Sequence, residues 1–219
     1  MFIKKNTIMI TMEIDLSLIG MEKGRQYETI ITTENIQGIK HAAPIGVLCS
    51  GKDTILNRIF KGSQTLDNIV SQSEFVVNIC NSPQLFTESL IGNLSDEHFN
   101  DDLSLKAADA HFKCRVTKLT EAVKQSDPIR NKGEALVIKS EVVDMTINKE
   151  TAAFNRGFGY VIESLTNFSR FDLVEGEEKE FYVKRFREAY RIVNKVGTRQ
   201  DIQAMHKIKK ELENKGHNL

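Results

Sequence analysis

Alternation of apolar and polar residues with a period of two dominates the first two thirds of the chain. Segments with this pattern are rich in β-branched and aromatic residues and are bounded by turn-forming stretches such as "ENIQG" and "GKD". The pattern predicts strands over 27–33, 42–50, 54–60, 74–80, 110–123 and 134–147. In "EFVVNIC", for example, Phe75, Val77 and Ile79 share one face. The number and length of these segments predict a curled antiparallel sheet or a small barrel.

Two stretches between the strands have a different pattern. In "SQTLDNIVSQ" (63–72), Leu66, Ile69 and Val70 fall on one face of a short helix. Residues 81–109 are irregular and polar, with a short helix expected near "PQLFTESLIG". An irregular stretch of this length inside a compact domain is usually a functional loop or an interface arm.

After Asn148 the apolar residues recur with the 3.6-residue period of a helix. The stripes are Phe154, Phe158, Val161, Ile162, Leu165 and Phe168, then Phe181, Val183, Phe186, Tyr190 and Val193, then Ile202, Met205, Ile208 and Leu212. Gly197 is expected to end the second helix, and Thr198 with Asp201 to begin the third in a pattern like a capping box. The second and third helices should therefore be antiparallel.

We interpret the apolar stripes of the three helices as core. We predict a barrel domain over residues 1–148 and a helical subdomain over residues 149–219.

Composition places the chain among soluble globular proteins. Of its 219 residues, 40% are hydrophobic and 27% are charged, which allows a substantial core. The apolar runs are too short to span a bilayer, and no small-residue cleavage site follows the N-terminal lysines. We therefore expect neither a membrane segment nor a signal peptide. Met9 and Met12 offer later starts, and about the first 14 residues are expected to be an extension.

The cysteines, histidines and charges indicate which kinds of site the chain can form. Cys49, Cys80 and Cys114 are widely spaced and form no C-x-x-C, so we expect small buried thiols in a reducing cytoplasm. The five histidines show no metal-ligand spacing. Residues 179–219 hold eleven Lys or Arg against five Asp or Glu, although the whole chain is neutral. A basic tail can bind nucleic acid, but helical spacing around an apolar stripe favours a solvated helix face.

The stretch "RIFKGSQTLDNI", which begins at Arg58, is the strongest candidate binding segment. It is not a P-loop, which needs a longer glycine-rich pattern. Gly62 lets backbone amides approach a ligand, Ser63 and Thr65 offer hydroxyl groups, and the start of the following helix favours an anion. Arg58 and Lys61 add positive charge, Arg58 with a bidentate option. Alternatively, Ser63 only caps the helix, and these residues alone leave both interpretations open.

The strand "HAAPIGVLC" has unusually small side chains. Ala42, Ala43, Pro44 and Gly46 leave little bulk, and proline removes a ladder donor, which marks an edge or a bulge. A flat ring could lie against such a backbone and hydrogen-bond to it. Close packing of strands would explain the same residues equally well.

The segment "NRGFGYVIESLTNFSR" contains two glycines within a helical pattern. Each costs roughly 1 kcal/mol relative to alanine, which implies close packing. Arg156, Glu163 and Arg170 recur every seven residues on one helix face. This spacing favours a structural ion network, with a ligand contact as the alternative. We assign no catalytic side chain and no metal site from the sequence.

Taken in order, "GMEKGRQYETIITT", "AAPIGV", "RIFKGSQTLDNI", "EFVVNI" and "NRGFGYVIESLTNFSR" resemble DUF447, an archaeal family of unknown function found in methanogens. That family is similar to the FMN-binding split barrels, which include flavin reductases and pyridoxamine-phosphate oxidase. The resemblance covers nearly the whole chain from Asp15, and its strongest motifs are "AAPIGV" and "KGSQTLDNI". The chain departs from it at His41, where asparagine is expected.

The resemblance implies a mainly β fold of the α+β class, an FMN-binding split β-barrel followed by C-terminal helices that look like the family's own addition. It also implies a homodimer with FMN near the interface. The resemblance places the FMN phosphate at Arg58, Lys61, Gly62, Ser63 and Thr65. It places the isoalloxazine ring along Ala43, Pro44, Ile45, Gly46 and Val47. Asn78 would lie next to the site. The arm around Phe86, Thr87 and Glu88 would close the pocket from the same or the other subunit.

These implications lead to a functional hypothesis of an FMN-dependent oxidoreductase of the flavin reductase-like type. The flavin would transfer hydride or electrons while the protein orients and tunes it. Its small-molecule redox partner is open, and a deazaflavin such as F420 is one option, either as donor or as the bound cofactor. The alternative is a flavin carrier without catalysis. Nucleic-acid binding through the basic tail is the least favoured hypothesis.

Overall fold

The computed structural model describes residues 14–92, 94–123, 134–217 and 219. Most of the expected N-terminal extension and the whole "KQSDPIRNKG" connection lie outside these residues. The strands are β1 (Gln26–Glu34), β2 (Lys40–Cys49), β3 (Thr54–Phe60), β4 (Glu74–Ile79), β5 (Ala110–Val123) and β6 (Glu134–Ile147). The helices are α1 (Gln64–Gln72), α2 (Pro83–Ile91), α3 (Gly157–Ser169), α4 (Gly176–Val196) and α5 (Arg199–Asn214), with 3-10 turns η1 (Leu16–Ile19), η2 (Asp96–His98) and η3 (Phe171–Leu173).

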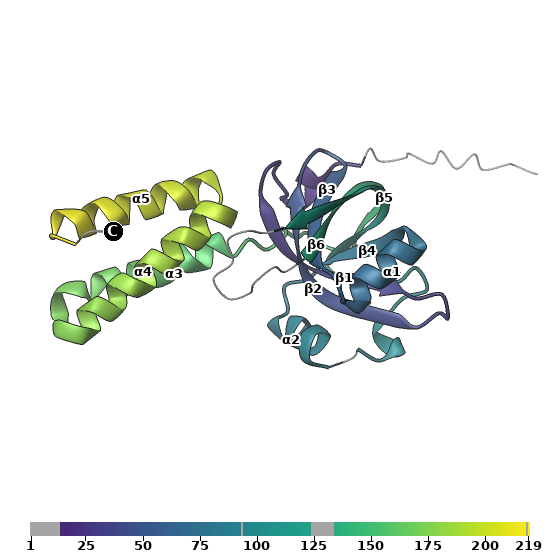
Figure 1. Cartoon of the computed structure of the whole chain (residues 1–219), viewed down its shortest axis with the longest axis horizontal. Helices are drawn as coiled ribbons and strands as arrows, with labels where there is room; N and C mark the ends of the chain where they lie inside the picture. The colour runs from purple at the N-terminus through teal and green to yellow at the C-terminus, as the bar shows by residue number, and fades with distance from the viewer. Residues whose placement is uncertain (1–13, 93, 124–133, 218) are drawn as a thin grey trace, which may run out of the picture.

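The six strands form a closed antiparallel barrel in the order β1-β2-β3-β6-β5-β4 (Figure 1). The predicted strands are confirmed to within two residues at each end. They are readable from sequence because each strand packs alternate residues into the barrel core, which favours a period of two, although β1 and β4 also bury most of their other face. The predicted fold class, a split β-barrel with C-terminal helices, is also confirmed.

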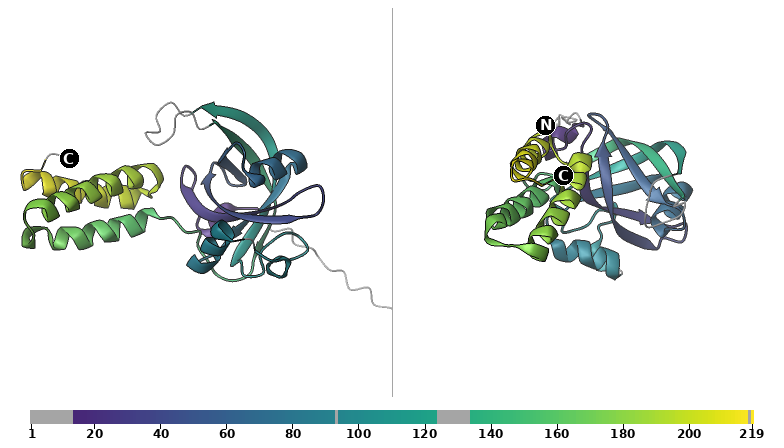
Figure 2. Two further views of the ribbon diagram at one scale, coloured as in Figure 1. Left: turned by 60° about the horizontal axis from the view of Figure 1, so that its bottom comes forward. Right: turned by 60° about the vertical axis from the view of Figure 1, so that its left-hand side comes forward.

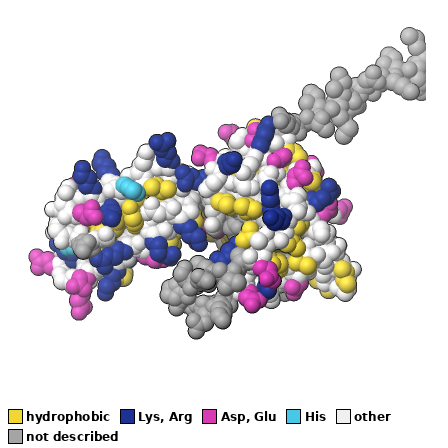
Figure 3. Space-filling model, turned by 45° about the horizontal axis from the view of Figure 1, so that its top comes forward, with side chains coloured by type: hydrophobic (Ala, Val, Ile, Leu, Met, Phe, Trp, Pro, Cys, Tyr) yellow, Lys and Arg dark blue, Asp and Glu magenta, His cyan; other side chains and the backbone are white. Residues whose placement is uncertain are grey.

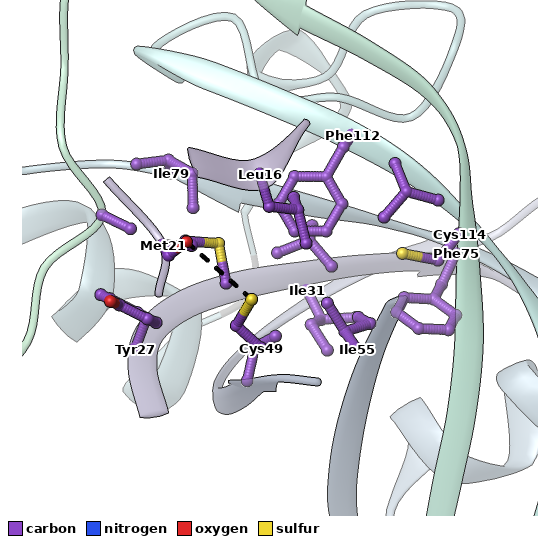
Figure 4. Packing of buried hydrophobic residues seen from close by; sticks show 14 of the residues in the cluster. Leu16, Met21, Tyr27, Ile31, Cys49, Ile55, Phe75, Ile79, Phe112 and Cys114 are labelled. Carbon is purple, nitrogen blue, oxygen red and sulfur yellow. Dashed lines mark hydrogen bonds between the residues drawn. The ribbon is translucent and has the colours of Figure 1, made fainter. Parts of the chain in front are cut away.

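Large apolar side chains fill the barrel. Ile31, Ile55, Phe75 and Phe112 are almost completely buried there (Figure 4). Each such burial contributes roughly 1.5–3 kcal/mol to folding. All three cysteines are also buried and free, as expected, and burial raises the pKa of the Cys80 thiol to about 12. The thiols therefore stay protonated and behave as small apolar groups.

Helix α1 joins the barrel core through one face. Leu66 and Ile69 are buried in that core, whereas Val70 is half exposed, so only two of the three predicted apolar contacts form. The Asn68 amide donates to the Thr33 hydroxyl at 3.0 Å and fixes α1 against β1. The start of α1 is thereby held close to β1 and β2.

The irregular segment between β4 and β5 covers the outside of the barrel. Phe99, Leu105 and Leu85 of this segment pack with Ile30 of β1 and Ala42 of β2 in a second, smaller core. The helix expected near "PQLFTESLIG" is α2, capped by Ser82. The segment is thus an arm laid along β1 and along β2, which carries the "AAPIGV" motif.

Helices α3, α4 and α5 lie side by side at one end of the barrel (Figures 1 and 2). Their shared core contains Val161, Phe186, Val193 and Met205. The predicted capping box at Thr198 is confirmed, with reciprocal bonds to Asp201. Part of the first stripe does not enter this core, because Phe158, Ile162 and Leu165 of α3 remain exposed. The interpretation of that whole stripe as core is therefore wrong within the single chain.

Asn155 ties the helices to the barrel. Its amide donates to the carbonyls of Gln26 and Val196 at 2.7 and 2.6 Å, and its side-chain oxygen accepts from the N–H of Gly157 at 2.7 Å. A Cβ at Gly157 would come within 2.6 Å of the Cα of Gly197. The close packing expected of the helical glycines is therefore present at Gly157. None of the described helices is long and apolar enough to cross a membrane.

Candidate functional site

Strands β2 and β3 separate before either one ends. β1 pairs with β2 along residues 40–48, but β3 pairs with β2 only at 47–49, opposite 55–57. β3 nevertheless continues to Phe60 along β6. Among the residues that the structure describes, the edge of β2 over residues 40–46 therefore has no strand partner on the β3 side, and we call this unpaired edge the gap.

The ladder geometry decides which backbone groups face the gap. The Cys49 N–H donates toward β1, to the Arg25 carbonyl, and the Ser50 N–H donates toward β3. Because peptide groups alternate in direction along a strand, those of Pro44 and Gly46 face the gap. Peptide groups without a ladder partner are available to the polar edge of a flat ligand.

The five predicted ring-binding residues divide between the two faces of β2. Ile45 and Val47 pack into the barrel core, and alternation places Ala43 on the same face. Pro44 and Gly46 lie on the outer face. Among these five residues, only Pro44 can therefore meet a ligand outside the barrel through its side chain, because Gly46 has none. The other contacts would be made by the backbone.

Close packing explains one of the small residues. The side chain of Gln26 lies over Gly46, where a Cβ would clash with its amide nitrogen. Pro44, two residues earlier, instead lines a cavity. The two interpretations of the "AAPIGV" segment therefore apply to different residues.

Arg58 stands on the outer face of β3 with unused hydrogen-bonding capacity. Its guanidinium lies 5.3 Å from the centre of the Phe60 ring. Its Nε and Nη2 atoms are buried, and neither has a hydrogen-bond partner among the described residues. Buried donors without partners cost free energy, so they indicate a binding group that completes them. A phosphate fits a guanidinium fork in this position.

A short turn over residues 61–63 joins the end of β3 to the start of α1. Gly62 has φ of 82°, a left-handed conformation that glycine adopts readily. The Ser63 hydroxyl accepts from the Leu66 N–H at 3.4 Å and donates to the Phe60 carbonyl at 3.0 Å. Ser63 is therefore a helix cap in this structure, as the alternative interpretation proposed. Thr65, by contrast, is buried in the first turn.

Lys61 points toward other partners. Its Nζ lies 2.9 Å from Glu134 and 3.1 Å from Glu121, on the hairpin of β5 and β6. These carboxylates raise the pKa of Lys61, chiefly through the hydrogen bond to Glu134. The side chain of Lys61, one of the predicted phosphate ligands, is therefore already paired. A phosphate would have to compete with both carboxylates for it.

Asn78 is fully buried and already hydrogen-bonded. Its amide donates to the Ile30 carbonyl and the Thr32 hydroxyl, both at 3.0 Å, and its oxygen accepts from the Leu105 N–H at 2.8 Å. These bonds hold the arm between β4 and β5 against β1. The described contacts of Asn78 are thus structural, and direct ligand contact remains a prediction.

A cavity of about 550 Å³ lies on the outer face of β1 and β2 beside Pro44. Phe86 and Phe154 give it mostly apolar walls, and a Glu28–Arg156 ion pair at 3.2 Å supplies charge. Its size is within the range of small-molecule sites. The expectation that the arm around Phe86 contributes to a pocket with the "AAPIGV" strand fits this arrangement.

Sequence reasoning missed part of this cavity. The Glu28 N–H donates to the Phe154 carbonyl at 2.8 Å, a contact between distant parts of the chain that no local pattern reveals. Arg156 bonds to Glu28, and Glu163 bonds to Arg185 at 3.4 Å. The predicted ion network along α3 is therefore wrong, because Arg156 and Glu163 pair with residues of other elements.

His41 occupies the position where the resemblance led us to expect asparagine. Burial lowers the pKa of its imidazole. Since the folded pKa is below that of the unfolded chain, near 6.5, protonation favours unfolding as the pH falls below about 6.5. We expect the loss of unfolding free energy between pH 7.5 and pH 5 to be smaller in His41→Asn, by at most about 1 kcal/mol. Urea titrations at both pH values measure this, and equal losses would contradict it.

Comparisons with known proteins agree with the motifs. The family model for the N-terminal domain of DUF447, a protein of unknown function, matches residues 27–149, and the model for its C-terminal part matches residues 155–210. The chain belongs to the DUF447 family. A DUF447 relative, the uncharacterized protein MJ1453 of Methanocaldococcus jannaschii, is 24% identical over 181 residues, 80% of this chain and 92% of that protein.

Two solved structures are similar to the chain. The FMN-bound DUF447 protein MM1853 from Methanosarcina mazei is 27% identical, with a TM-score of 0.51 over 90% of this chain and 99% of that one. A putative flavin reductase with a split barrel domain from Shewanella frigidimarina is 13% identical, with a TM-score of 0.45 over 57% of this chain and 68% of that one.

Proposed function

We propose that this DUF447 protein binds FMN, with the phosphate at Arg58 and the start of α1 and the ring along the β2 edge of the gap. The observation that carries the proposal is that two guanidinium nitrogens of the half-buried Arg58, Nε and Nη2, are buried and lack hydrogen-bond partners among the described residues. The FMN bound to MM1853 supports the choice of flavin.

The residues around Arg58 suit a phosphate. The first turn of a helix leaves N–H groups without intrahelical partners and carries a partial positive charge. Ser63 and Thr65 lie at that turn, and Gly62 keeps the approach open because no atom lies within 4 Å of a Cβ built there. The guanidinium group of Arg58 would donate hydrogen bonds to the phosphate oxygens. Lys61 would contribute only if it left its carboxylates.

Strand β2 suits the ring. Peptide groups of Pro44 and Gly46 face the gap and can bond to the polar edge of an isoalloxazine, while Ala43, Ile45 and Val47 would add backbone contacts. Pro44 also lines the cavity whose mostly apolar walls include Phe86 and Phe154. Asn78 would act by holding the arm that carries Phe86 in place.

A bound flavin would supply hydride or electron transfer, so the protein needs no catalytic side chain of its own. The chain would orient the ring and shield it from water. We therefore propose an oxidoreductase of the flavin reductase-like type that acts as a homodimer in the cytoplasm. Its small-molecule redox partner would enter through the cavity beside Pro44.

Flavin absorbance tests the proposal. We expect purified protein, or protein mixed with FMN at micromolar concentration and then desalted, to retain the visible flavin bands. If the protein retained a deazaflavin such as F420 and did not retain FMN, the site would bind the deazaflavin and not FMN. The ligand assignment is lost if neither is retained.

Turnover separates an oxidoreductase from a flavin carrier. The FMN-loaded protein should bleach anaerobically when a nicotinamide or deazaflavin donor is added, and the colour should return with an acceptor. Tight FMN binding without reduction by any of these donors would favour the carrier.

A further inference from the structure

The cavity beside Pro44 has one positively charged side chain in its wall. Most of the wall is apolar and includes Pro44, Phe86 and Phe154. Among the described residues that line the cavity, Arg156 is the only Lys or Arg. On the face shown in Figure 3, the Lys and Arg side chains of the C-terminal helices are instead spread over the surface. A few polar groups in an apolar cavity decide which ligand it takes.

Other polar side chains of the wall are already engaged. The Asn81 amide donates to the Asp109 carboxylate at 3.3 Å. The Ser82 hydroxyl caps α2. The Glu28–Arg156 ion pair is therefore the strongest polar feature that the cavity offers to a ligand.

The ion pair leaves the hydrogen-bonding capacity of Arg156 unused. Its Nε lies 3.2 Å from Oε1 of Glu28, yet both atoms are buried and neither has a hydrogen-bond partner among the described residues. A guanidinium group presents a planar fork of N–H donors, which matches the two oxygens of a carboxylate or the oxygens of a phosphate. Arg156 can therefore bind such a group while Glu28 stays beside it.

Exposure decides which member of the pair a ligand meets. The side chain of Arg156 is 42% exposed and that of Glu28 is 25% exposed. The cation is thus the more accessible charge, and Oε1 of Glu28 is buried behind it. A charge of the opposite sign is favoured there, because attraction between charges strengthens beside apolar walls. The cavity therefore suits an anionic ligand better than a cationic one.

Hydrogen bonds to β1 hold Arg156 in the wall. The carbonyl of Phe154 accepts from the Glu28 N–H at 2.8 Å, and the Asn155 amide donates to the Gln26 carbonyl at 2.7 Å. The segment before α3 therefore forms a bridge along β1. A binding group on a fixed backbone loses little freedom when a ligand arrives, which favours affinity.

We propose that Arg156 is a specificity-determining residue that selects an anionic redox partner. Its guanidinium group binds a carboxylate or phosphate of that molecule, and the apolar part of the molecule lies against Phe86 and Phe154. This inference rests on the proposed function, in which the redox partner enters through this cavity. Pro44 belongs both to the cavity and to the β2 edge of the gap, so a molecule held at Arg156 would lie next to the proposed flavin ring.

Three probes of similar shape and different charge test the preference: naphthoate, naphthylmethanol and naphthylmethylammonium. Titration calorimetry with the protein as purified measures their affinities. We expect the anion to bind at least about 10-fold more tightly than the neutral probe, and the cation to bind most weakly. Equal affinities, tightest binding of the cation, or no binding of any probe overturns the proposal.

Arg156→Gln should weaken naphthoate binding at least about 10-fold and leave naphthylmethanol binding unchanged, which also shows that the cavity is intact. Arg170→Gln is the matched control, because Arg170 ends the same helix, is exposed and does not line the cavity. Phe86→Ala should weaken both probes alike, which places them in the cavity. Normal naphthoate binding in Arg156→Gln, or in Phe86→Ala, contradicts the assignment.

Flavin retention separates this inference from the proposed function. Arg156→Gln should retain FMN as well as the wild type does, because Arg156 belongs neither to the phosphate site nor to the β2 edge. If neither protein retains FMN while naphthoate binding still depends on Arg156, the proposed cofactor fails and the anion site stands. Loss of FMN from Arg156→Gln alone would assign Arg156 to the flavin and overturn its role in selecting the redox partner.

Discussion

Replacing Arg58 with alanine is expected to weaken FMN binding about 10- to 100-fold and to change riboflavin binding by no more than a few fold. A hydrogen bond to a charged group contributes roughly 1.5–3 kcal/mol, which corresponds to this range. Only FMN carries the phosphate, so the difference between the two ligands isolates the phosphate contact. Quenching of flavin fluorescence during titration with protein measures both affinities.

Arg115→Ala serves as the control for Arg58. Arg115 also lies on a barrel strand, but it is exposed and pairs with Glu74 at 3.1 Å, so its loss should leave both affinities unchanged. Ser63→Ala should also reduce FMN affinity more than riboflavin affinity, by a smaller factor because Ser63 is shared with the helix cap. Equal losses for FMN and riboflavin in Arg58→Ala would place the phosphate elsewhere.

Replacing Asn78 with leucine is expected to lower the free energy of unfolding by about 2–4 kcal/mol. The variant leaves the Ile30 carbonyl and the Leu105 N–H without the partners that Asn78 provides, and unsatisfied buried groups cost about 1–3 kcal/mol each. Chemical denaturation of the flavin-free protein measures this. Asn194→Leu on the exposed face of α4 should change the value by less than about 0.5 kcal/mol.

The same variant separates a structural role of Asn78 from a ligand contact. If Asn78 mainly holds the arm between β4 and β5, stability falls and flavin affinity falls only as the arm loosens. A variant of normal stability whose FMN affinity is lost would contradict the structural role.

Local patterns were sufficient for the secondary structure. Each strand buries one face in the barrel, so its apolar residues alternate, and the six predictions agree with the structure to within two residues. The capping box at Thr198 was equally readable, because its bonds join residues only three positions apart. Features that form within one strand or one turn depend on neighbouring residues, so the local sequence predicts them.

Partners distant in sequence were not readable. Arg156 was expected to pair along its own helix, yet it bonds to Glu28. Lys61 was predicted to be a phosphate ligand, but Glu121 and Glu134 of the adjoining strands β5 and β6 pair with it. The choice among several opposite charges depends on which strands become neighbours, and this is a property of the topology.

The sequence by itself determined the strands, the helices, the family and the two segments that form the edges of the gap, because these follow from local periodicity and short motifs. Only the tertiary structure decided that β2 and β3 separate there, that Nε and Nη2 of Arg58 are buried without hydrogen-bond partners among the described residues, and that Phe158, Ile162 and Leu165 of α3 remain exposed. Strand pairing and burial arise from contacts between distant segments. The same apolar stripe can therefore become core or remain exposed, depending on what packs against it.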